Sequence, residues 1–430
     1  MTNPILRRPL AQGVSFSALR DPKFKLNRLS VHFIVPLREE TASDYAMLSL
    51  LLRKGCRSCP DFTQLNRKFD WLYGADLSTD VLKIGANQIV TFSVTTIDDR
   101  YTIGGERLVF ECAQMLRELL FEPLIEDGTF DADSFEVERR YLIDTIEAEI
   151  KDKRAWAVAE CTRLMGRGDP ASLRKYGSLE GARKTTPQSA AAAWHTLIDT
   201  AGVEIFFIGS GDPSDAERVF ADAFADRPAP CRYLPPRIVA RAESVQEHTE
   251  YLQVVQSKLV LGFRTGERPP IGEQAAIRLA VAVLGGTPSS KLFLNVREKR
   301  SLCYYCAARY SRISAVMLID SGIEHANIAA AREAILHELD DLRAGRFDDD
   351  TMKFTVLQMI GALKSVSDSA GASEDWYLNR ILLGEMSTPQ EEIEALQRVT
   401  RDDVVAAAQK ITLDTVYLLT EKQGGGADDN

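Results

Sequence analysis

The feature that most constrains this chain is an order of predicted elements that occurs twice along it. The strand predicted from Leu29 has a counterpart that starts at Lys258, an offset of 229 residues. A short helix and a second strand repeat at an offset of 227 residues, Phe62 with Ser289 and Ile89 with Val316. Self-similarity at about half the chain length indicates duplication. The sequence therefore predicts an α+β fold of two homologous domains, each a mostly antiparallel β-sheet packed with helices.

The boundary between the two domains is predicted from a change in composition. The stretch R-P-A-P-C-R-Y-L-P-P-R, from Arg227 to Arg237, holds four prolines and disfavours both helices and central strands. We therefore predict an N-terminal domain over 1–226, a linker over 227–240 and a C-terminal domain over 241–422. The tail 423–430 is predicted to be disordered because it consists largely of glycine and aspartate.

The start of the chain predicts a β-hairpin. Two short runs with strand-like composition, Val14–Leu19 and Phe24–Leu29, flank the turn-like stretch R-D-P-K. Because the strands of a hairpin pair with each other, these two runs are expected to be neighbours in one sheet.

Charge and hydropathy exclude several classes of partner. The formal charge of −10 argues against nucleic acid, because binding to phosphates needs a basic surface. No run of 18 apolar residues is present, so we predict no membrane span and no membrane partner. The first residues, M-T-N-P-I-L-R-R-P-L, lack the uninterrupted apolar core of a signal peptide, and the predicted location is the cytoplasm.

The seven cysteines include two C-x-x-C pairs, Cys56/Cys59 and Cys303/Cys306. An odd count without a secretion signal favours reduced thiols over a disulfide framework. The pairs begin 247 positions apart, whereas a zinc ribbon keeps its pairs roughly 15–20 residues apart. Cys56 also follows Gly55, a predicted helix C-cap, where the helix dipole disfavours a thiolate. We interpret all four as packing residues, and a thiol or metal role stays open as an alternative.

Motifs of zinc, nucleotide and serine-hydrolase sites are absent from the sequence. The five histidines lie too far apart for two of them to share a helical turn, and neither H-E-x-x-H nor H-x-x-E-H occurs. The one chemically distinctive stretch is a predicted helix end rich in cations that runs into aromatic residues: Arg297, Lys299 and Arg300, then Tyr304 and Tyr305. The residues alone allow two interpretations of this stretch, a binding patch or an ordinary solvated helix end.

Three segments carry a resemblance to a known family. They are L-L-F-E-P-L-I-E-D-G-T-F-D-A-D-S-F-E-V-E-R-R-Y-L-I-D-T-I-E-A-E (119–149), F-F-I-G-S-G-D-P (206–213) and S-S-K-L-F-L-N-V-R-E-K-R-S-L-C-Y (289–304). With the order of elements, they resemble the insulinase/pitrilysin metallopeptidases, and most closely the bacterial half-size members related to mitochondrial processing peptidase. The resemblance covers nearly the whole chain. It implies two similar α+β domains in each chain, with two chains closing around an unfolded peptide.

The resemblance also implies that the catalytic zinc site of the family is missing here. The family's zinc helix carries H-x-x-E-H ahead of a K-G-T-like turn, which Lys54-Gly55-Cys56 matches. The two histidine positions and the catalytic glutamate between them fall on Ala46, Leu50 and Ser49. The third ligand, a glutamate seven residues after the one matched by Glu138, falls on Thr145. We therefore expect no metal or other cofactor in this chain, with zinc held by a partner chain.

A second motif of the family is retained. Its arginine–tyrosine pair, seven residues apart, matches Arg297 and Tyr304. In the family this pair reaches the zinc site of the other half, where it binds the substrate backbone and helps to stabilise the tetrahedral oxyanion. The chain departs from the usual R-E-K-R-G-L-A-Y in having Ser301 for glycine and Cys303 for alanine.

The sequence therefore predicts a catalytically incomplete, zinc-less subunit of a heterodimeric zinc metallopeptidase that acts on unfolded peptides. Arg297 and Tyr304 would serve in trans at the site of a zinc-bearing homologue. The alternative is a non-catalytic peptide-binding or scaffold protein of the same fold that acts as a homodimer. An adjacent gene for an H-x-x-E-H homologue would favour the heterodimer.

Overall fold

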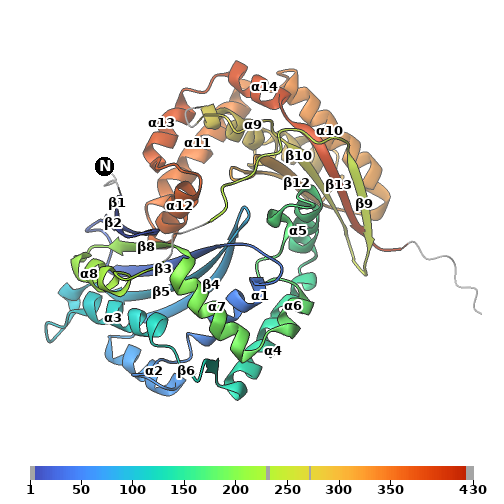
Figure 1. Cartoon of the computed structure of the whole chain (residues 1–430). Coiled ribbons are helices and arrows are strands. Elements are labelled where there is room, and N and C mark those ends of the chain that lie inside the picture. Colours follow the sequence, from blue (N-terminus) through green and yellow to red (C-terminus); the bar gives the residue numbers. More distant parts are fainter. Residues whose placement is uncertain (1–4, 229–232, 271–272, 423–430) are drawn as a thin grey trace, which may run out of the picture. The chain divides into compact units, whose positions relative to one another are not determined.

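The computed structural model describes residues 5–228, 233–270 and 273–422 (Figure 1). The predicted tail 423–430 and part of the predicted linker, 229–232, lie outside the described residues. The chain forms two compact units that alternate along the sequence. Unit 1 comprises Met1–Glu147, Asp169–Pro235 and Val366–Met386, and unit 2 comprises Ala148–Gly168, Pro236–Ser365 and Ser387–Asn430.

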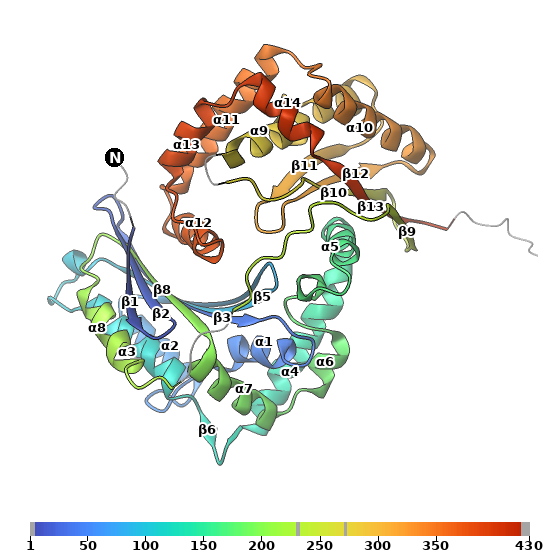
Figure 2. The same ribbon diagram turned by 45° about the horizontal axis from the view of Figure 1, so that its top comes forward.

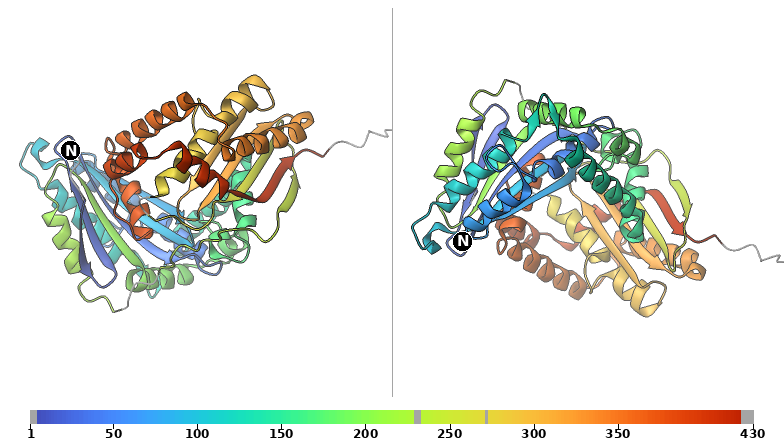
Figure 3. Two further views of the ribbon diagram at one scale, coloured as in Figure 1. Left: turned by 90° about the horizontal axis from the view of Figure 1, so that it is seen from above. Right: turned by 90° about the horizontal axis from the view of Figure 1, so that it is seen from below.

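Unit 1 is built on a six-stranded sheet in the order β1-β2-β8-β3-β5-β4. These strands are β1 (Leu6–Ala11), β2 (Val14–Arg20), β8 (Gly202–Gly209), β3 (Leu26–Pro36), β5 (Asn87–Ile97) and β4 (Asp76–Ile84). All neighbours are antiparallel except β2 and β8, which run parallel. The predicted hairpin is wrong, because β2 pairs with β1 and β8 lies between β2 and β3 (Figure 3). The sequence concealed β1 because L-R-R-P-L-A is polar and largely exposed.

One face of this sheet holds the main hydrophobic core. Alternate residues of β3, among them Val31 and Phe33, join Phe92 of β5 and Phe207 of β8 beneath a layer of helices (Figure 2). The helices are α1 (Ala42–Leu51), α2 (Phe62–Trp71), α3 (Leu108–Phe121), α4 (Ala132–Ala148), α6 (Leu179–Lys184), α7 (Pro187–Thr200) and α8 (Ser214–Ala223). A short hairpin, β6 (Ile125–Glu126) with β7 (Thr129–Phe130), connects α3 to α4.

The opposite face of the sheet carries both polar and apolar side chains and is covered by α12 (Ala370–Leu382) (Figure 2). Glu374 of α12 accepts hydrogen bonds from the Arg28 guanidinium at 2.9 and 3.2 Å and from the Ser30 hydroxyl at 2.7 Å. His32 places Nε2 3.1 Å from the same carboxylate and Nδ1 2.9 Å from the Thr91 hydroxyl. His32 and Glu374 are only 1% and 2% exposed. Glu374 therefore links α12 to β3 through a buried network of polar contacts.

Unit 2 is built on a five-stranded sheet in the order β11-β12-β10-β13-β9. The strands are β11 (Tyr305–Ser311), β12 (Val316–Ile323), β10 (Ser257–Arg264), β13 (Thr412–Thr420) and β9 (Gln246–Tyr251). Its helices are α5 (Lys153–Met165), α9 (Gln274–Gly285), the π-helix η5 (Leu292–Lys299), α10 (Ile328–Arg343), α11 (Asp349–Val366), α13 (Pro389–Gln397) and α14 (Arg401–Gln409). The pairs are antiparallel except β13 with β9, which run parallel.

The two sheets share one topology. The order β2-β8-β3-β5-β4 of unit 1 corresponds to β9-β13-β10-β12-β11 of unit 2, with the single parallel pair at the same place in each. The additional strand β1 extends only the sheet of unit 1. This correspondence confirms the predicted α+β fold of two similar halves, each with a mostly antiparallel sheet.

Each half of the chain contributes one equivalent helix to the other unit. Helix α5 follows α4 as α12 follows α11, and both pairs are related by an offset of 217 residues. Helix α5 belongs to unit 2, where Ala157 and Cys161 pack with Val260 and Tyr417 of the sheet. Helix α12 belongs to unit 1. The predicted boundaries 1–226 and 241–422 divide the chain into its two repeats, and the compact units cross that division at these two helices.

Helix length and hydropathy also bear on the predicted absence of a membrane span. Within the described ranges, every helix is too short or too polar to cross a bilayer.

Candidate functional site

The positions of the family's zinc helix lie on α1, whose residues are buried almost throughout. The side chains of Ala46 and Leu50 are apolar and pack in the core of unit 1. Ser49 is also buried, and its hydroxyl donates a 2.8 Å hydrogen bond to the Ala46 carbonyl. This helix therefore presents a methyl group, an isobutyl group and an occupied hydroxyl where the family has two imidazoles and a carboxylate.

The third ligand position lies on α4. Thr145 uses its hydroxyl to donate a 2.8 Å hydrogen bond to the Tyr141 carbonyl one turn earlier. Glu138 is 3% exposed, and its carboxylate lies 2.6 Å from the Lys54 ammonium and 3.6 Å from the Arg53 guanidinium. The one acidic group retained here is therefore already paired with two cations that follow α1.

Arg297 lies on η5, a π-helix anchored by the buried side chains of Leu292 and Val296. The guanidinium of Arg297 stacks over the Phe293 ring at 4.4 Å from its centroid and lies 3.6 Å from the Glu298 carboxylate. Its side chain is partly exposed, because its neighbours on η5 fill the interior and leave it at the surface. The Arg297 guanidinium is thus positioned by Phe293 and Glu298 and is still accessible at the surface.

Tyr304 lies one residue before β11 and is 52% exposed. Its amide donates a 2.9 Å hydrogen bond to the Gly322 carbonyl, which ties the residue to β12. Its hydroxyl donates a 2.7 Å hydrogen bond to the Glu324 carboxylate. That hydrogen bond and the charge of Glu324 raise the pKa of Tyr304, so the phenol is a neutral donor near pH 7.

The turn between η5 and β11 has a left-handed residue. Ser301 has φ of +51°, a conformation that glycine adopts without steric cost and serine does not. The Leu302 amide then donates a 3.1 Å hydrogen bond to the Val296 carbonyl and closes the turn. The residue that departs from the family's usual glycine thus occupies a position where the backbone itself favours glycine.

Comparisons with known proteins find similar sequences and the same fold. Residues 184–359 match the family described as the Peptidase M16 inactive domain. A Bacillus subtilis (strain 168) protein described as "Probable inactive metalloprotease YmfF" is 26% identical over 96% of this chain and 97% of its own length. A solved structure of a conserved protein from Enterococcus faecalis V583 has a TM-score of 0.90 and 25% identity, covering 99% of this chain and 100% of that chain.

The fold is also shared at lower sequence identity. The solved structure of a peptidase M16 inactive domain from Pseudomonas fluorescens has a TM-score of 0.77 and 16% identity, over 98% of this chain and 100% of that chain. These comparisons all point to the insulinase, or M16, family of metallopeptidases, which this chain resembles in sequence and in fold. The family resemblance and the duplicated metallopeptidase-like fold predicted from the sequence are thereby confirmed.

The M16 zinc does not fit the residues of this chain. Protein zinc sites use imidazole, thiolate or carboxylate ligands, and Ala46, Ser49, Leu50 and Thr145 supply none of these. Both hydroxyls in this set already donate to backbone carbonyls. The prediction that this chain lacks the catalytic zinc agrees with this donor chemistry and with the description of the B. subtilis relative. No step of metal-assisted hydrolysis can therefore be derived from these residues.

A cluster of one histidine and two carboxylates on α10 could suggest a metal site, but a lysine ammonium already lies beside it. A metal site needs at least three histidine, cysteine, aspartate or glutamate side chains with their ligand atoms close together. Among the described residues, one such group has its ligand atoms within 4.8 Å of one another: His337, Glu338 and Asp341 of α10. The Lys291 ammonium lies 3.0 Å from Glu338 and 3.7 Å from Asp341. These residues therefore form an ion-pair cluster, since a metal ion would have to displace the Lys291 ammonium.

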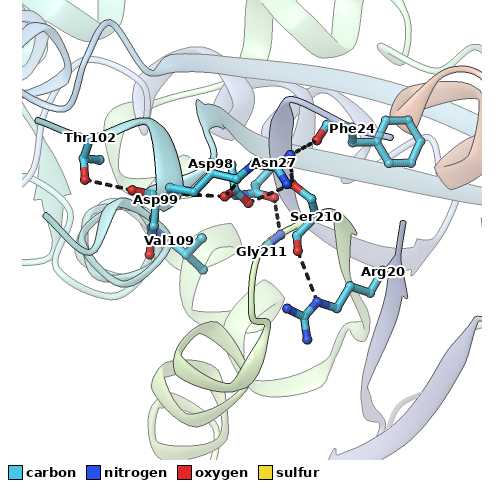
Figure 4. Close-up of polar contacts among 10 residues, drawn as sticks. Arg20, Phe24, Asn27, Asp98, Asp99, Thr102, Val109, Ser210 and Gly211 are labelled. Carbon is cyan, nitrogen blue, oxygen red and sulfur yellow. Dashed lines mark hydrogen bonds and ion pairs between the residues drawn. The ribbon is translucent and has the colours of Figure 1, made fainter. Parts of the chain in front are cut away.

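The M16-like segment 206–213 has a structural role that Figure 4 makes clear. A Cβ at Gly209 would lie 2.1 Å from the side-chain oxygen of Asn27, which accepts a 2.9 Å hydrogen bond from the Gly211 amide. Asn27 and Ser210 both donate to Asp98, at 3.2 and 2.8 Å. Burial opposes the charge of Asp98, but these donors and Arg100 lower its pKa overall. Because Gly209 and Gly211 have no side chain, the end of β8 can pack directly against Asn27 of β3.

The two C-x-x-C pairs lie in different units and differ in surroundings. Cys56 and Cys59 are both buried, and each amide donates to the carbonyl of the other, at 2.9 and 3.0 Å. Burial raises the pKa of the Cys56 thiol. Gly55 has no room for a side chain, because a Cβ would lie 2.6 Å from the Cys59 carbonyl oxygen. This first pair is a tightly packed turn, as the packing interpretation expects.

Sequence reasoning missed Glu324, which holds the Tyr304 hydroxyl. The two residues are twenty positions apart, and they meet only because β11 and β12 pair, with Tyr305 opposite Gly322. A predicted hairpin over these strands would have placed Glu324 next to Tyr304. The glutamate itself carries no motif that sets it apart from the other acidic residues of the chain.

Proposed function

We propose that this chain is the zinc-less subunit of a heterodimeric zinc metallopeptidase that acts on unfolded peptides. The observation that carries the proposal is the contrast between the two motifs. All four zinc-site positions have side chains that cannot act as zinc ligands or as a general base, whereas Arg297 and Tyr304 keep accessible polar ends on unit 2. In this proposal the pair acts at a reaction centre that another chain supplies.

The chemistry of the pair suits a peptide substrate. A guanidinium carries a fixed charge and five donors, and a neutral phenol carries one donor, so together they can bind a peptide carbonyl and an oxyanion that develops from it. In this structure the Tyr304 hydroxyl donates to Glu324. Engagement of a substrate would require this hydroxyl to turn from the glutamate toward the peptide. Activation of water would come from the zinc-bearing partner.

A mixing experiment tests the proposal. The chain, a zinc-bearing M16 homologue from the same genome and their mixture are assayed on a quenched unfolded peptide, with zinc measured in each separated chain. We expect no activity from the chain alone and faster turnover in the mixture than from the homologue by itself. A mixture no faster than the homologue, with no complex on size exclusion, would contradict the heterodimer.

One observation favours a second candidate, a homodimeric peptide-binding or scaffold protein. Both members of the pair are already satisfied within this chain, Arg297 by Phe293 and Glu298 and Tyr304 by Glu324. A structural role would need no partner active site. Saturable binding of an unfolded peptide by a homodimer of this chain, with no gain in hydrolysis on mixing, would support this candidate over the first.

We also propose a location in the cell for this chain. We place the chain in the cytoplasm because its six described cysteines are free thiols, a state that the cytosol maintains. Fractionation of cells that express the tagged full chain would test this location. Recovery of the chain outside the cytoplasmic fraction would contradict it.

A further inference from the structure

We propose that helix α11 pairs with α11 of a second copy of this chain, with the two helices antiparallel across a two-fold axis. The pairing surface, the α11 stripe, consists of five exposed residues: Asp350, Phe354, Leu357, Gly361 and Lys364. All five belong to unit 2, and none belongs to η5 or β11. The inference therefore goes beyond the proposed function and does not rest on it.

The stripe places two large apolar side chains in solvent. Phe354 is 51% exposed and Leu357 is 56% exposed. The buried residues of α11 are Thr351, Thr355 and Leu363. Because each residue turns a helix by about 100°, the stripe is centred on the side of α11 opposite to these three. Phe354 and Leu357 therefore face away from the buried side of the helix, where another molecule can reach them.

The spacing of the stripe suits a pair of helices. Its residues follow one another by four, three, four and three positions, which is the 3.5-residue repeat of helices that pack along a seam. The stripe extends along α11 for roughly 21 Å. A seam with two large apolar side chains from each copy is small for an interface, so we expect a weak and reversible dimer.

The stripe is complementary to itself when two copies run antiparallel. Asp350 and Lys364 each lie seven positions from Leu357, so a two-fold axis at Leu357 places Asp350 of one copy opposite Lys364 of the other. The axis repeats this contact at the other end of the seam. Phe354 then lies beside Gly361 of the second copy, where an added Cβ would meet nothing within 4 Å and a ring has room. Leu357 packs against its own symmetry mate.

The charges at the two ends of the stripe are available for this pairing. Asp350 and Lys364 are exposed, and among the described residues neither has an ion-pair partner. The neighbouring Asp349 differs, because its carboxylate lies 2.6 Å from the Arg401 guanidinium. A parallel pairing would place Asp350 against Asp350 and Lys364 against Lys364, which like-charge repulsion disfavours. The charges therefore select the antiparallel arrangement.

The equivalent helix of the other repeat lacks this complementarity. The offset of 217 residues relates α11 to α4, and the positions on α4 that correspond to the stripe are Asp133, Val137, Arg140, Asp144 and Glu147. All five are exposed, but four of them are charged. In the same antiparallel pairing Asp133 would face Glu147, and the two carboxylates would repel each other. The stripe is therefore a property of α11 and does not follow from the shared fold.

Sedimentation velocity of the full chain, over a range of concentrations up to its solubility, tests the self-association. We expect a reversible monomer–dimer equilibrium. Leu357→Glu places two carboxylates at the axis and should raise the Kd of the dimer at least about tenfold. Arg140→Glu, at the equivalent position of α4, is the matched control and should leave the Kd unchanged. A chain that is monomeric at every concentration, or a dimer that Leu357→Glu leaves intact, would overturn the proposal.

Exchanged charges test the antiparallel arrangement. Asp350→Lys and Lys364→Asp should each raise the Kd about tenfold, since two exposed ion pairs become repulsive contacts. The double variant Asp350→Lys/Lys364→Asp should restore the Kd of the unaltered chain, and added salt should shrink the effect of each single variant. Circular dichroism checks that every variant folds. A double variant that dimerises no better than the single ones would refute the antiparallel pairing.

Failure of this proposal and failure of the proposed function can be told apart. Sedimentation uses the chain alone, whereas the mixing experiment uses the chain together with the zinc-bearing homologue. A monomeric chain that still accelerates the homologue would overturn the α11 pairing and leave the proposed function in place. A dimer that depends on Leu357, with no gain in hydrolysis on mixing, would support the α11 pairing and contradict the proposed function.

Discussion

At the scale of single residues, Ser301 shows how a departure from a family pattern acquires a physical meaning. The resemblance identified the substitution of serine for glycine, and the structure adds the left-handed backbone at that position. Serine pays a steric cost there that glycine does not. Tyr304 follows this turn, so the conformation of the turn bears on the proposed function.

Replacement of Ser301 by glycine should stabilise the chain. We expect Ser301→Gly to raise the free energy of unfolding by about 0.5–1 kcal/mol, because relief of the left-handed strain exceeds the entropy that glycine adds to the unfolded state. Urea denaturation measures the change. The matched control is Gly74→Ala, where φ is +70° and a Cβ meets nothing within 4 Å. It should destabilise by about 1 kcal/mol. Shifts of the same sign in both variants would show that the backbone argument is wrong.

The Glu324 carboxylate should control the acidity of Tyr304. Its hydrogen bond and charge raise the pKa of Tyr304 from the ordinary value of 10.0, so Glu324→Ala should lower it toward that value. Ionisation of tyrosine is followed by ultraviolet absorbance, and Tyr304→Phe in each background isolates the one residue among twelve tyrosines. An identical Tyr304 titration with and without Glu324 would refute the hydrogen bond as the cause.

At the scale of elements, much of the fold could be predicted because its signals are local. The strand predicted over Val316–Ile323 coincides with β12, and the helix predicted from Phe62 is α2. Periodicity of apolar residues identifies such elements without knowledge of their partners. The exchange of α5 and α12 could not be predicted in this way. The apolar stripe of α5 shows that one face is buried but not which sheet buries it.

The docking of α12 on unit 1 should depend on pH through Glu374. Although burial opposes its charge, His32 and Arg28 lower the pKa of Glu374 from 4.5 to about 2. Because the folded-state pKa is the lower one, its contribution to stability is complete above pH 4.5 and is lost as pH falls toward 2. A shift of this size corresponds to about 3 kcal/mol.

The variant Glu374→Gln tests this network. At pH 7 it should destabilise unit 1 by about 3–5 kcal/mol, because the Arg28 guanidinium loses the carboxylate that compensates its charge and His32 loses the carboxylate beside it. The difference from wild type in urea unfolding should shrink as the pH falls below 4.5. Glu180→Gln, which breaks an exposed pair with Lys184, should leave the unfolding midpoint unchanged and serves as control. A difference that stays constant from pH 7 to pH 3 would contradict the assignment.

At the scale of the whole molecule, the proposed function assigns different roles to the two repeats. In unit 1, the positions predicted to match the family's zinc helix lie on α1, which is filled with core side chains. Unit 2 holds Arg297 and Tyr304 at its surface, and Glu324 accepts a hydrogen bond from Tyr304. The sequence singles out Arg297 and Tyr304 only through the resemblance, because the family's pair is seven residues apart, and their role stays a prediction. Glu324 could not be predicted, because only the pairing of two strands brings it near Tyr304.

The last prediction concerns the complex that the proposed function requires. In a mixture with the zinc-bearing homologue, Arg297→Ala and Tyr304→Phe should each lower peptide turnover by roughly 10²–10³, the scale for removal of one oxyanion donor. Because a donor to the transition state acts on the chemical step, kcat should fall with kcat/KM. Glu180→Gln, on the exposed surface of α6, is the control and should retain full turnover. Unchanged turnover in both variants, with complex formation intact, would remove the pair from catalysis and leave the scaffold as the better account of why these residues remain.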